Sequence, residues 1–155
     1  MKSDVYYIKE ALKEAHKAYL IDEVPVGCVI VKDDKIIARG YNKREKLESP
    51  LAHAEIIAIK KASLKLNSWR LDDCVMYITL EPCVMCGGAI IQARIPKVVY
   101  GAYDYRFGVH KSKFNLFDIS FNHTVLINGG VLEEECSKLI SDFFKELRNK
   151  KLENK

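Results

Sequence analysis

The chain has 155 residues, of which 48% are hydrophobic and 30% are charged, and its formal net charge is +4. These values are typical of one soluble globular domain, and no uncharged apolar run is long enough to predict a membrane span. Five cysteines without a regular framework argue against a secreted disulfide scaffold, so we expect a cytoplasmic protein. The mild positive charge permits an anionic partner without requiring one.

Hydrophobic periodicity predicts helices and strands that alternate along the chain. In chain order we expect a helix at 3–20, a hairpin of strands at 26–32 and 35–40, a helix at 54–66, a strand at 74–79, a helix at 83–94, a strand at 97–101, a helical turn near 115–117, a strand at 124–128 and a helix at 131–149. The pattern predicts one domain over residues 1–150, followed by a frayed basic tail at 151–155. Its expected fold is a three-layer α/β/α sandwich with a mixed central sheet.

Two cysteines lie where the strand at 74–79 turns into the following helix. Cys83 and Cys86 follow Pro82 and open an apolar run. Because residues i and i+3 share a helix face, both sulfurs point the same way, and the positive end of the helix favours their thiolate forms. Taken alone, this pair is as consistent with redox chemistry as with metal binding.

A histidine and a glutamate at the start of another predicted helix favour the metal interpretation. His53 stands at the beginning of the helix at 54–66, and Glu55 lies two positions further on. Residues i and i+2 do not face each other on a helix, so Glu55 is poorly placed as a ligand but can reach a water molecule on the metal. Three protein ligands with one open position are the pattern of a catalytic zinc. A nearby carboxylate can take and return the proton of such a water.

These motifs resemble the zinc-dependent nucleoside and nucleobase deaminases. The segments that carry the resemblance are 23–27, Asn42, 52–56, 79–86 and 141–144, and together they are most similar to the bacterial tRNA-specific adenosine deaminases. The resemblance covers nearly the whole chain. It implies a cytidine deaminase-like fold and one Zn²⁺ per subunit, held by His53, Cys83 and Cys86. Its implied reaction is hydrolysis of adenosine to inosine at the wobble position of a tRNA anticodon loop, with Glu55 as the proton carrier.

The resemblance also implies contacts with the substrate. Asn42 would hold the target base, with Val26 packing beside it, although without the resemblance the residues alone favour a turn-forming role for Asn42. Asp104 would lie near the substrate backbone, and Phe144 and Arg148 near the RNA. The candidate phosphate contacts are Lys43, Arg44, Arg106, Lys111, Lys113 and Arg148. The segment 107–113 departs from the pattern of the family.

The implied partners are a tRNA anticodon stem-loop and a second copy of the chain, because the substrate site of the family is built across subunits. Two other functions remain open. One is a deaminase of a free nucleobase or nucleoside, which would use the same metal ligands. The other is a non-catalytic, zinc-stabilised RNA-binding domain. A fourth protein ligand would favour that domain, but neither His110 nor His123 stands at motif spacing.

Overall fold

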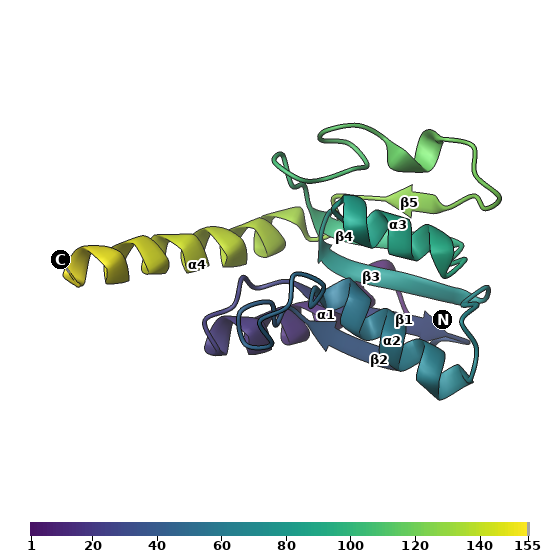
Figure 1. Ribbon diagram of the computed structural model, residues 1–155, viewed down its shortest axis with the longest axis horizontal. Helices are drawn as coiled ribbons and strands as arrows, with labels where there is room; N and C mark the ends of the chain where they lie inside the picture. The colour runs from purple at the N-terminus through teal and green to yellow at the C-terminus, as the bar shows by residue number, and fades with distance from the viewer. Residues whose placement is uncertain (155) are drawn as a thin grey trace.

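The computed structural model describes residues 1–154, which form a mixed five-stranded sheet with helices on both faces (Figure 1). The elements are α1 Asp4–Leu20, β1 Gly27–Lys32, β2 Lys35–Tyr41, α2 Ala54–Leu66, β3 Cys74–Leu80, α3 Val84–Gln92, β4 Lys97–Ala102, the 3₁₀ turn η1 Leu116–Asp118, β5 Leu126–Asn128 and α4 Glu133–Glu153. The strand order is β2-β1-β3-β4-β5. Strand β1 is antiparallel to β2 and β3, whereas β3, β4 and β5 are parallel. The predicted α/β/α sandwich on a mixed sheet is confirmed.

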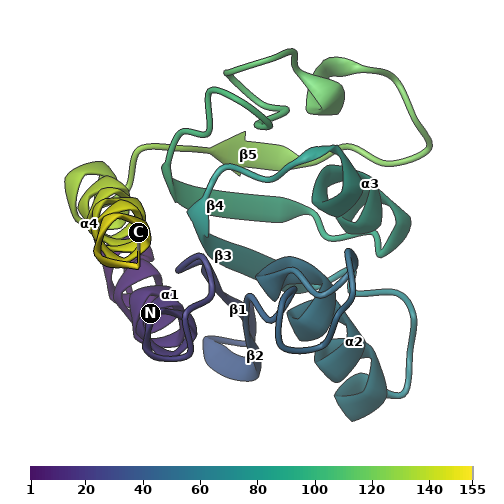
Figure 2. The same cartoon turned by 60° about the vertical axis from the view of Figure 1, so that its left-hand side comes forward.

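The central strands are apolar on both faces because the sheet separates two hydrophobic cores. Ile30 and Val98 face the core beneath α2 and α3. Their neighbours Val29 and Val99 face the core under α1 and the start of α4. Figure 2 shows this division, with α1 and α4 on one side of the sheet and α2 and α3 on the other. Since successive strand residues point to opposite faces, a strand covered on both sides reads as a continuous apolar run.

Helix α1 begins and packs as its sequence predicts. The side chain of Ser3 accepts a hydrogen bond from the Tyr6 N–H at 3.1 Å, which caps the helix. Gly27 allows the backbone of β1 to approach α1, since a Cβ at this position would lie 2.0 Å from the carbonyl oxygen of Ala11. A larger residue here would force the helix off the sheet.

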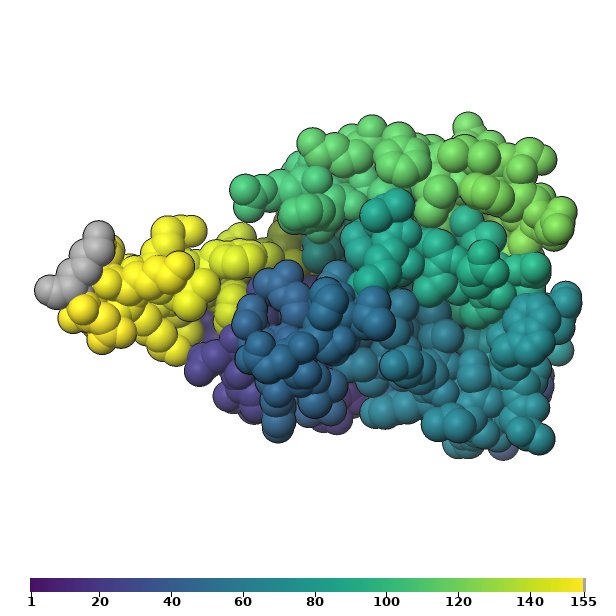
Figure 3. Space-filling model, viewed as in Figure 1, coloured from purple at the N-terminus to yellow at the C-terminus, as the bar shows by residue number. Residues whose placement is uncertain are grey.

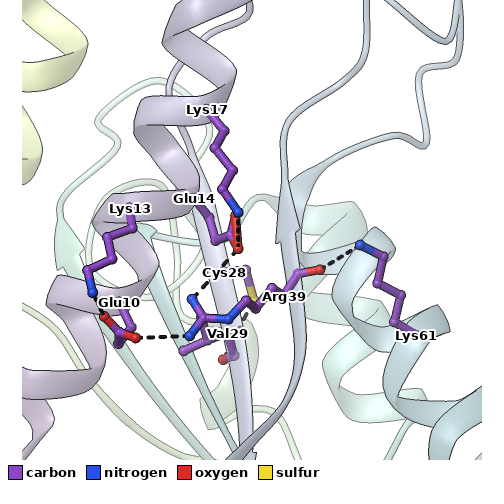
Figure 4. Close-up of polar contacts among 8 residues, drawn as sticks. All are labelled: Glu10, Lys13, Glu14, Lys17, Cys28, Val29, Arg39 and Lys61. Atoms are coloured by element: carbon purple, nitrogen blue, oxygen red, sulfur yellow. Dashed lines mark hydrogen bonds and ion pairs between the residues drawn. The ribbon is translucent and has the colours of Figure 1, made fainter.

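Ion pairs fasten α1 to the edge strand β2 (Figure 4). The guanidinium of Arg39 lies 2.9 Å from the carboxylate of Glu10 and 3.7 Å from that of Glu14. Both glutamates are buried, and the carbonyl oxygen of Arg39 accepts a hydrogen bond from the Lys61 ammonium on α2. Arg39 therefore connects both helix layers to the edge of the sheet.

The element boundaries differ from the sequence prediction at α3, β5 and α4. Helix α3 begins at Val84 rather than Cys83 and ends at Gln92, because Arg94 adopts a left-handed backbone with φ 63°. Strand β5 begins two residues later than expected, at Leu126. The left-handed Leu132 delays α4 to Glu133.

The far end of α4 also differs from the expectation. The helix continues to Glu153, so residues 151–153 are helical where a frayed tail was expected, and Lys155 lies outside the described residues. Figures 1 and 3 show α4 projecting beyond the sheet. Of the helices formed by residues 1–154, none has the length and apolar character needed to cross a bilayer.

Candidate metal centre

His53 is placed by the start of α2. It is the N-cap residue, with an extended backbone at φ −78° and ψ 154°, and its side chain makes no capping hydrogen bond. N-cap positions usually carry Ser, Thr, Asp or Asn, whose side chains bond the first backbone N–H groups. The imidazole is therefore not used by the helix and can serve as a ligand.

The two cysteines are placed by the start of α3. Cys83 is the N-cap, with φ −81° and ψ 177°, and it too makes no side-chain capping bond. Cys86 lies within the first helical turn and is fully buried. Both helices thus present their N-terminal ends to a common point, as the sequence predicted, although Cys83 precedes the helix instead of belonging to it.

The three side chains have the spacing of ligands around one zinc ion. Nδ1 of His53 lies 3.7 Å from the Cys83 sulfur and 3.6 Å from the Cys86 sulfur. All three donor atoms lie within 4.8 Å of one another. Zinc–nitrogen bonds of about 2.0 Å and zinc–sulfur bonds of about 2.3 Å at a tetrahedral angle separate N and S by about 3.5 Å. Donor set and spacing therefore fit zinc, with Nδ1 as the imidazole ligand.

One of the two sulfurs is already in the thiolate state that a metal requires. A hydrogen bond with Cys86, opposed by partial burial and reinforced by His53, lowers the pKa of the Cys83 thiol to about 4. The same contact with Cys83 raises the pKa of the Cys86 thiol, and burial raises it further. One thiolate is thus present at neutral pH, and a divalent cation would favour ionisation of the second.

Glu55 lies beside this group without belonging to it. Its side chain is only 4% exposed, and it is absent from the cluster of donor atoms found among residues 1–154. Burial raises the pKa of the Glu55 carboxyl, and the charge of Cys83 adds to this shift, while the imidazole of His53 opposes it. A buried carboxyl with a raised pKa, next to a three-donor site, is suited to carrying a proton.

Two buried glutamates, neither with a role predicted from the sequence, hold the loop before His53 and the loop at 104–112. Glu23 accepts hydrogen bonds from the backbone N–H groups of Glu45 and Lys46 at 3.0 and 2.8 Å. Glu81, two residues before Cys83, accepts five hydrogen bonds from the loop at 104–112, four from backbone N–H groups and one from the Ser112 hydroxyl. In the sequence, the two glutamates stand out only as acidic residues within the segments 23–27 and 79–86.

The side chain of Asn42 bonds one backbone group in its own turn and one in the segment before β1. Its amide nitrogen donates to the carbonyl of Val24 at 3.2 Å, and its amide oxygen accepts from the Arg44 N–H at 3.1 Å. Asp104 behaves similarly, because its carboxylate accepts from the N–H groups of Arg106 and Phe107 at 3.2 Å. Both residues lie in the loops that Glu23 and Glu81 hold.

The other predicted substrate residues are dispersed. Val26 packs against the core beneath α2 and α3, and Arg44 is half-exposed beside Glu45. Phe144 and Arg148 are exposed on α4, on the opposite side of the sheet from α2 and α3 (Figure 2). No contact among residues 1–154 joins these two side chains to the metal group.

His110 and His123, the two other histidines considered as ligands, bond groups outside the metal group. His110 bonds the Tyr100 hydroxyl at 2.7 Å, and His123 bonds the carbonyl of Ile95 at 2.7 Å. Three cysteines outside the metal group lie in apolar stretches of the sequence and are buried: Cys28, Cys74 and Cys136. The apolar character of Trp69 predicts a packing role, and this prediction is wrong, because its side chain is 60% exposed.

Comparison with known proteins agrees with this geometry. Residues 1–102 match the family model for the cytidine and deoxycytidylate deaminase zinc-binding region. The tRNA-specific adenosine deaminase of Bacillus subtilis strain 168 is 47% identical over 152 residues, which are 97% of this chain and 94% of that protein.

Solved structures give the same result. One, from a study of A-to-I editing by tRNA:A34 deaminases at the wobble position of transfer RNA, has 38% identity and a TM-score of 0.83, covering 86% of this chain and 98% of that one. The X-ray structure of guanine deaminase from Bacillus subtilis has 33% identity and a TM-score of 0.64, covering 96% and 95%. The chain belongs to the zinc-binding cytidine and deoxycytidylate deaminase family, among the tRNA-specific adenosine deaminases.

Proposed function

We propose that the protein hydrolyses adenosine to inosine at the wobble position of a tRNA anticodon loop, releasing ammonia. The observation that carries the chemistry is the group of His53, Cys83 and Cys86 with the buried Glu55 beside it. The substrate is inferred from relatives that are tRNA-specific adenosine deaminases, similar over nearly the whole chain. The reaction consumes one water and exchanges the amino group on C6 of adenine for oxygen.

His53, Cys83 and Cys86 would hold the metal through one nitrogen and two sulfurs. Zinc in such a three-ligand site acidifies water, which supplies a hydrolytic nucleophile at neutral pH. The protein ligands leave one tetrahedral position open, since Glu55 is not among the donors. The buried position of Cys86 excludes bulk water from the inner side of the site.

Glu55 would move the protons of the reaction. It takes a proton from the attacking water and delivers it to N1 of the adenine ring, which makes C6 more electrophilic. It then helps to protonate the departing amino group, so that ammonia leaves as a neutral molecule. Burial of its side chain supports this role, because it raises the pKa of the carboxyl and so makes the carboxylate a better proton acceptor.

Asn42 and Val26 would hold the target base. An amide carries two N–H donors, and only one of those of Asn42 is used by the Val24 carbonyl, so one donor remains for a purine edge. We propose that Asp104 lies close to the sugar-phosphate backbone and that Arg44, with its half-exposed guanidinium, contacts a phosphate. Phe144 and Arg148 would meet more distant parts of the RNA along α4.

We also propose that the protein acts in the cytoplasm as a homodimer. Val84 follows Cys83 directly and is 61% exposed, so an apolar side chain stands in solvent at the edge of the site. A second copy covering this edge would complete the site across subunits. Light scattering of the purified, zinc-loaded protein would give twice the monomer mass, and a monomeric mass at micromolar concentration would contradict this assembly.

One experiment separates the candidate functions. The purified protein is incubated with an anticodon stem-loop that has adenosine at the wobble position and, separately, with free guanine, cytosine and nucleosides. Nuclease digestion and mass spectrometry then measure inosine and the other products. Inosine in the stem-loop alone supports the proposal. Product from free guanine alone would favour the activity of the guanine deaminase to which the fold is also similar, and RNA binding without product would favour a non-catalytic domain.

A further inference from the structure

The segment 105–107 exposes two aromatic rings on either side of an arginine. The side chains of Tyr105 and Phe107 are 75% and 66% exposed, and Arg106 between them is also exposed. Within residues 1–154, neither ring takes part in an aromatic pair or a cation–π contact. Large apolar surfaces in solvent are unfavourable, so two of them in three residues call for a partner.

The backbone that carries these rings is held in one conformation. The carboxylate of Asp104 accepts from the N–H groups of Arg106 and Phe107, and the carbonyl of Asp104 accepts from the Gly108 N–H at 2.8 Å. Gly108 packs against Glu81, since a Cβ there would lie 2.3 Å from the Glu81 carboxyl carbon. A ring on a rigid turn loses little conformational entropy when it binds a ligand.

The same turn is attached directly to the metal centre. Oε1 of Glu81 accepts from the Asp104 N–H at 3.1 Å, and the carbonyl of Pro82 accepts from the Val109 N–H at 3.0 Å. Glu81 and Pro82 are the two residues that precede Cys83. The loop that carries the exposed rings is therefore fixed to the segment that carries a metal ligand.

We propose that Tyr105 and Phe107 form a stacking surface for an unpaired base next to the target adenosine, and that Arg106 contacts its phosphate; this rests on the proposed function. Reaching a metal between two helix ends requires the adenosine to leave its stack, which unstacks its neighbours too. Aromatic side chains stack on any base, and the exposed Lys111 and Lys113 of the same loop add attraction for the backbone. The two rings thus contribute affinity for the loop without reading its sequence.

The chain offers a matched control at the other end of the sheet. Trp69 is 60% exposed and lies beside arginines, with the guanidinium of Arg70 5.2 Å from its ring centre. It precedes the first residue of β3, whereas Cys83 follows the last, so the two lie at opposite ends of that strand. Trp69→Ala removes an equally exposed ring without approaching the metal centre.

The test measures the dissociation constant of the anticodon stem-loop at fixed salt by fluorescence anisotropy, with inosine formation recorded in parallel. The variants are Tyr105→Ala/Phe107→Ala, Tyr105→Leu/Phe107→Leu, the aromatic exchange Tyr105→Phe/Phe107→Tyr, and Trp69→Ala. Each is also tested on RNAs with an abasic site on one or the other side of the target. Zinc content and thermal unfolding establish that every variant is folded.

Base–aromatic stacking contributes about 1–3 kcal/mol per base, so the alanine pair is expected to bind about tenfold more weakly or worse. The leucine pair, which keeps apolar volume without a ring face, loses a similar factor, while the aromatic exchange and Trp69→Ala stay within twofold. An abasic site on one of the two sides of the target weakens RNA binding by the wild type but not by the alanine pair. Unchanged binding of the alanine pair, or an equal abasic loss in both proteins, would overturn the proposal. Failure of the wild type to form inosine would instead refute the proposed function.

Discussion

Replacing Glu81 with glutamine tests how the loop at 104–112 is held. Every partner of this carboxylate is a donor: Oε2 accepts three backbone N–H groups at 2.8 to 3.2 Å, and Oε1 accepts the Asp104 N–H and the Ser112 hydroxyl. Glutamine keeps the shape but has one acceptor oxygen and no charge. If that oxygen takes the Oε2 position, each of its three hydrogen bonds contributes about 1 kcal/mol less to the free energy of unfolding. The Asp104 N–H is left without an acceptor, which costs about 1–3 kcal/mol more. Since the three share one oxygen, we expect a total of about 3–5 kcal/mol.

Urea unfolding of zinc-loaded protein, followed by circular dichroism, measures this loss of unfolding free energy. Ser112→Ala is the control, because it removes only the hydroxyl bond and is expected to lose about 1 kcal/mol. A Glu81→Gln variant within 1 kcal/mol of the wild type would refute the inference that this carboxylate anchors the loop.

The remaining predictions concern pH, catalysis, packing and the metal. Burial opposes but does not overcome the Ser112 and backbone hydrogen bonds that lower the pKa of Glu81. The difference in unfolding free energy between wild type and Glu81→Gln should therefore be full above the ordinary value of 4.5 and shrink as pH falls through the lower folded pKa. A difference that grows in acid would contradict this. Glu55→Ala should retain zinc by elemental analysis while inosine formation falls at least about 100-fold, and wild-type turnover would remove Glu55 from the mechanism. Gly27→Ala should lower the free energy of unfolding by more than about 2 kcal/mol because α1 approaches closely there. Gly88→Ala on α3, where a Cβ has open space around it, should raise it by about 0.5–1 kcal/mol. Thermal unfolding measures both, and equal effects would contradict the packing argument. His53→Ala should lower zinc content and melting temperature together, and an unchanged metal content would exclude His53 as a ligand.

The sequence predicts most of the fold because its elements are strongly periodic. The strands β1, β3 and β4 are continuous apolar runs, and α1 has both an amphipathic pattern and the cap at Ser3. Its errors fall where one backbone angle decides the outcome. Leu132 enters the left-handed region, which apolar periodicity does not encode, and so α4 starts later than expected.

The grouping of His53, Cys83 and Cys86 was predictable because their types and spacing are restrictive, and their geometry follows from two helix starts. The roles of Glu23 and Glu81 were not, since their partners are backbone N–H groups 22 and 23 or more residues away, and such groups leave no trace in the residue types. The exposure of Trp69 was not predicted either. Its apolar character suggested burial, but guanidinium groups cover its ring at the surface instead.

The attachment of the loop to Glu81 has a consequence for how substrate preference can change. The carboxylate binds mainly backbone N–H groups, which every amino acid except proline provides. Side chains at 105–107 therefore do not contribute to the anchor and can be exchanged without disturbing the turn that carries Cys83. Residues 105–107 are therefore open to variation, while the backbone hydrogen bonds that hold their loop to Glu81 stay fixed.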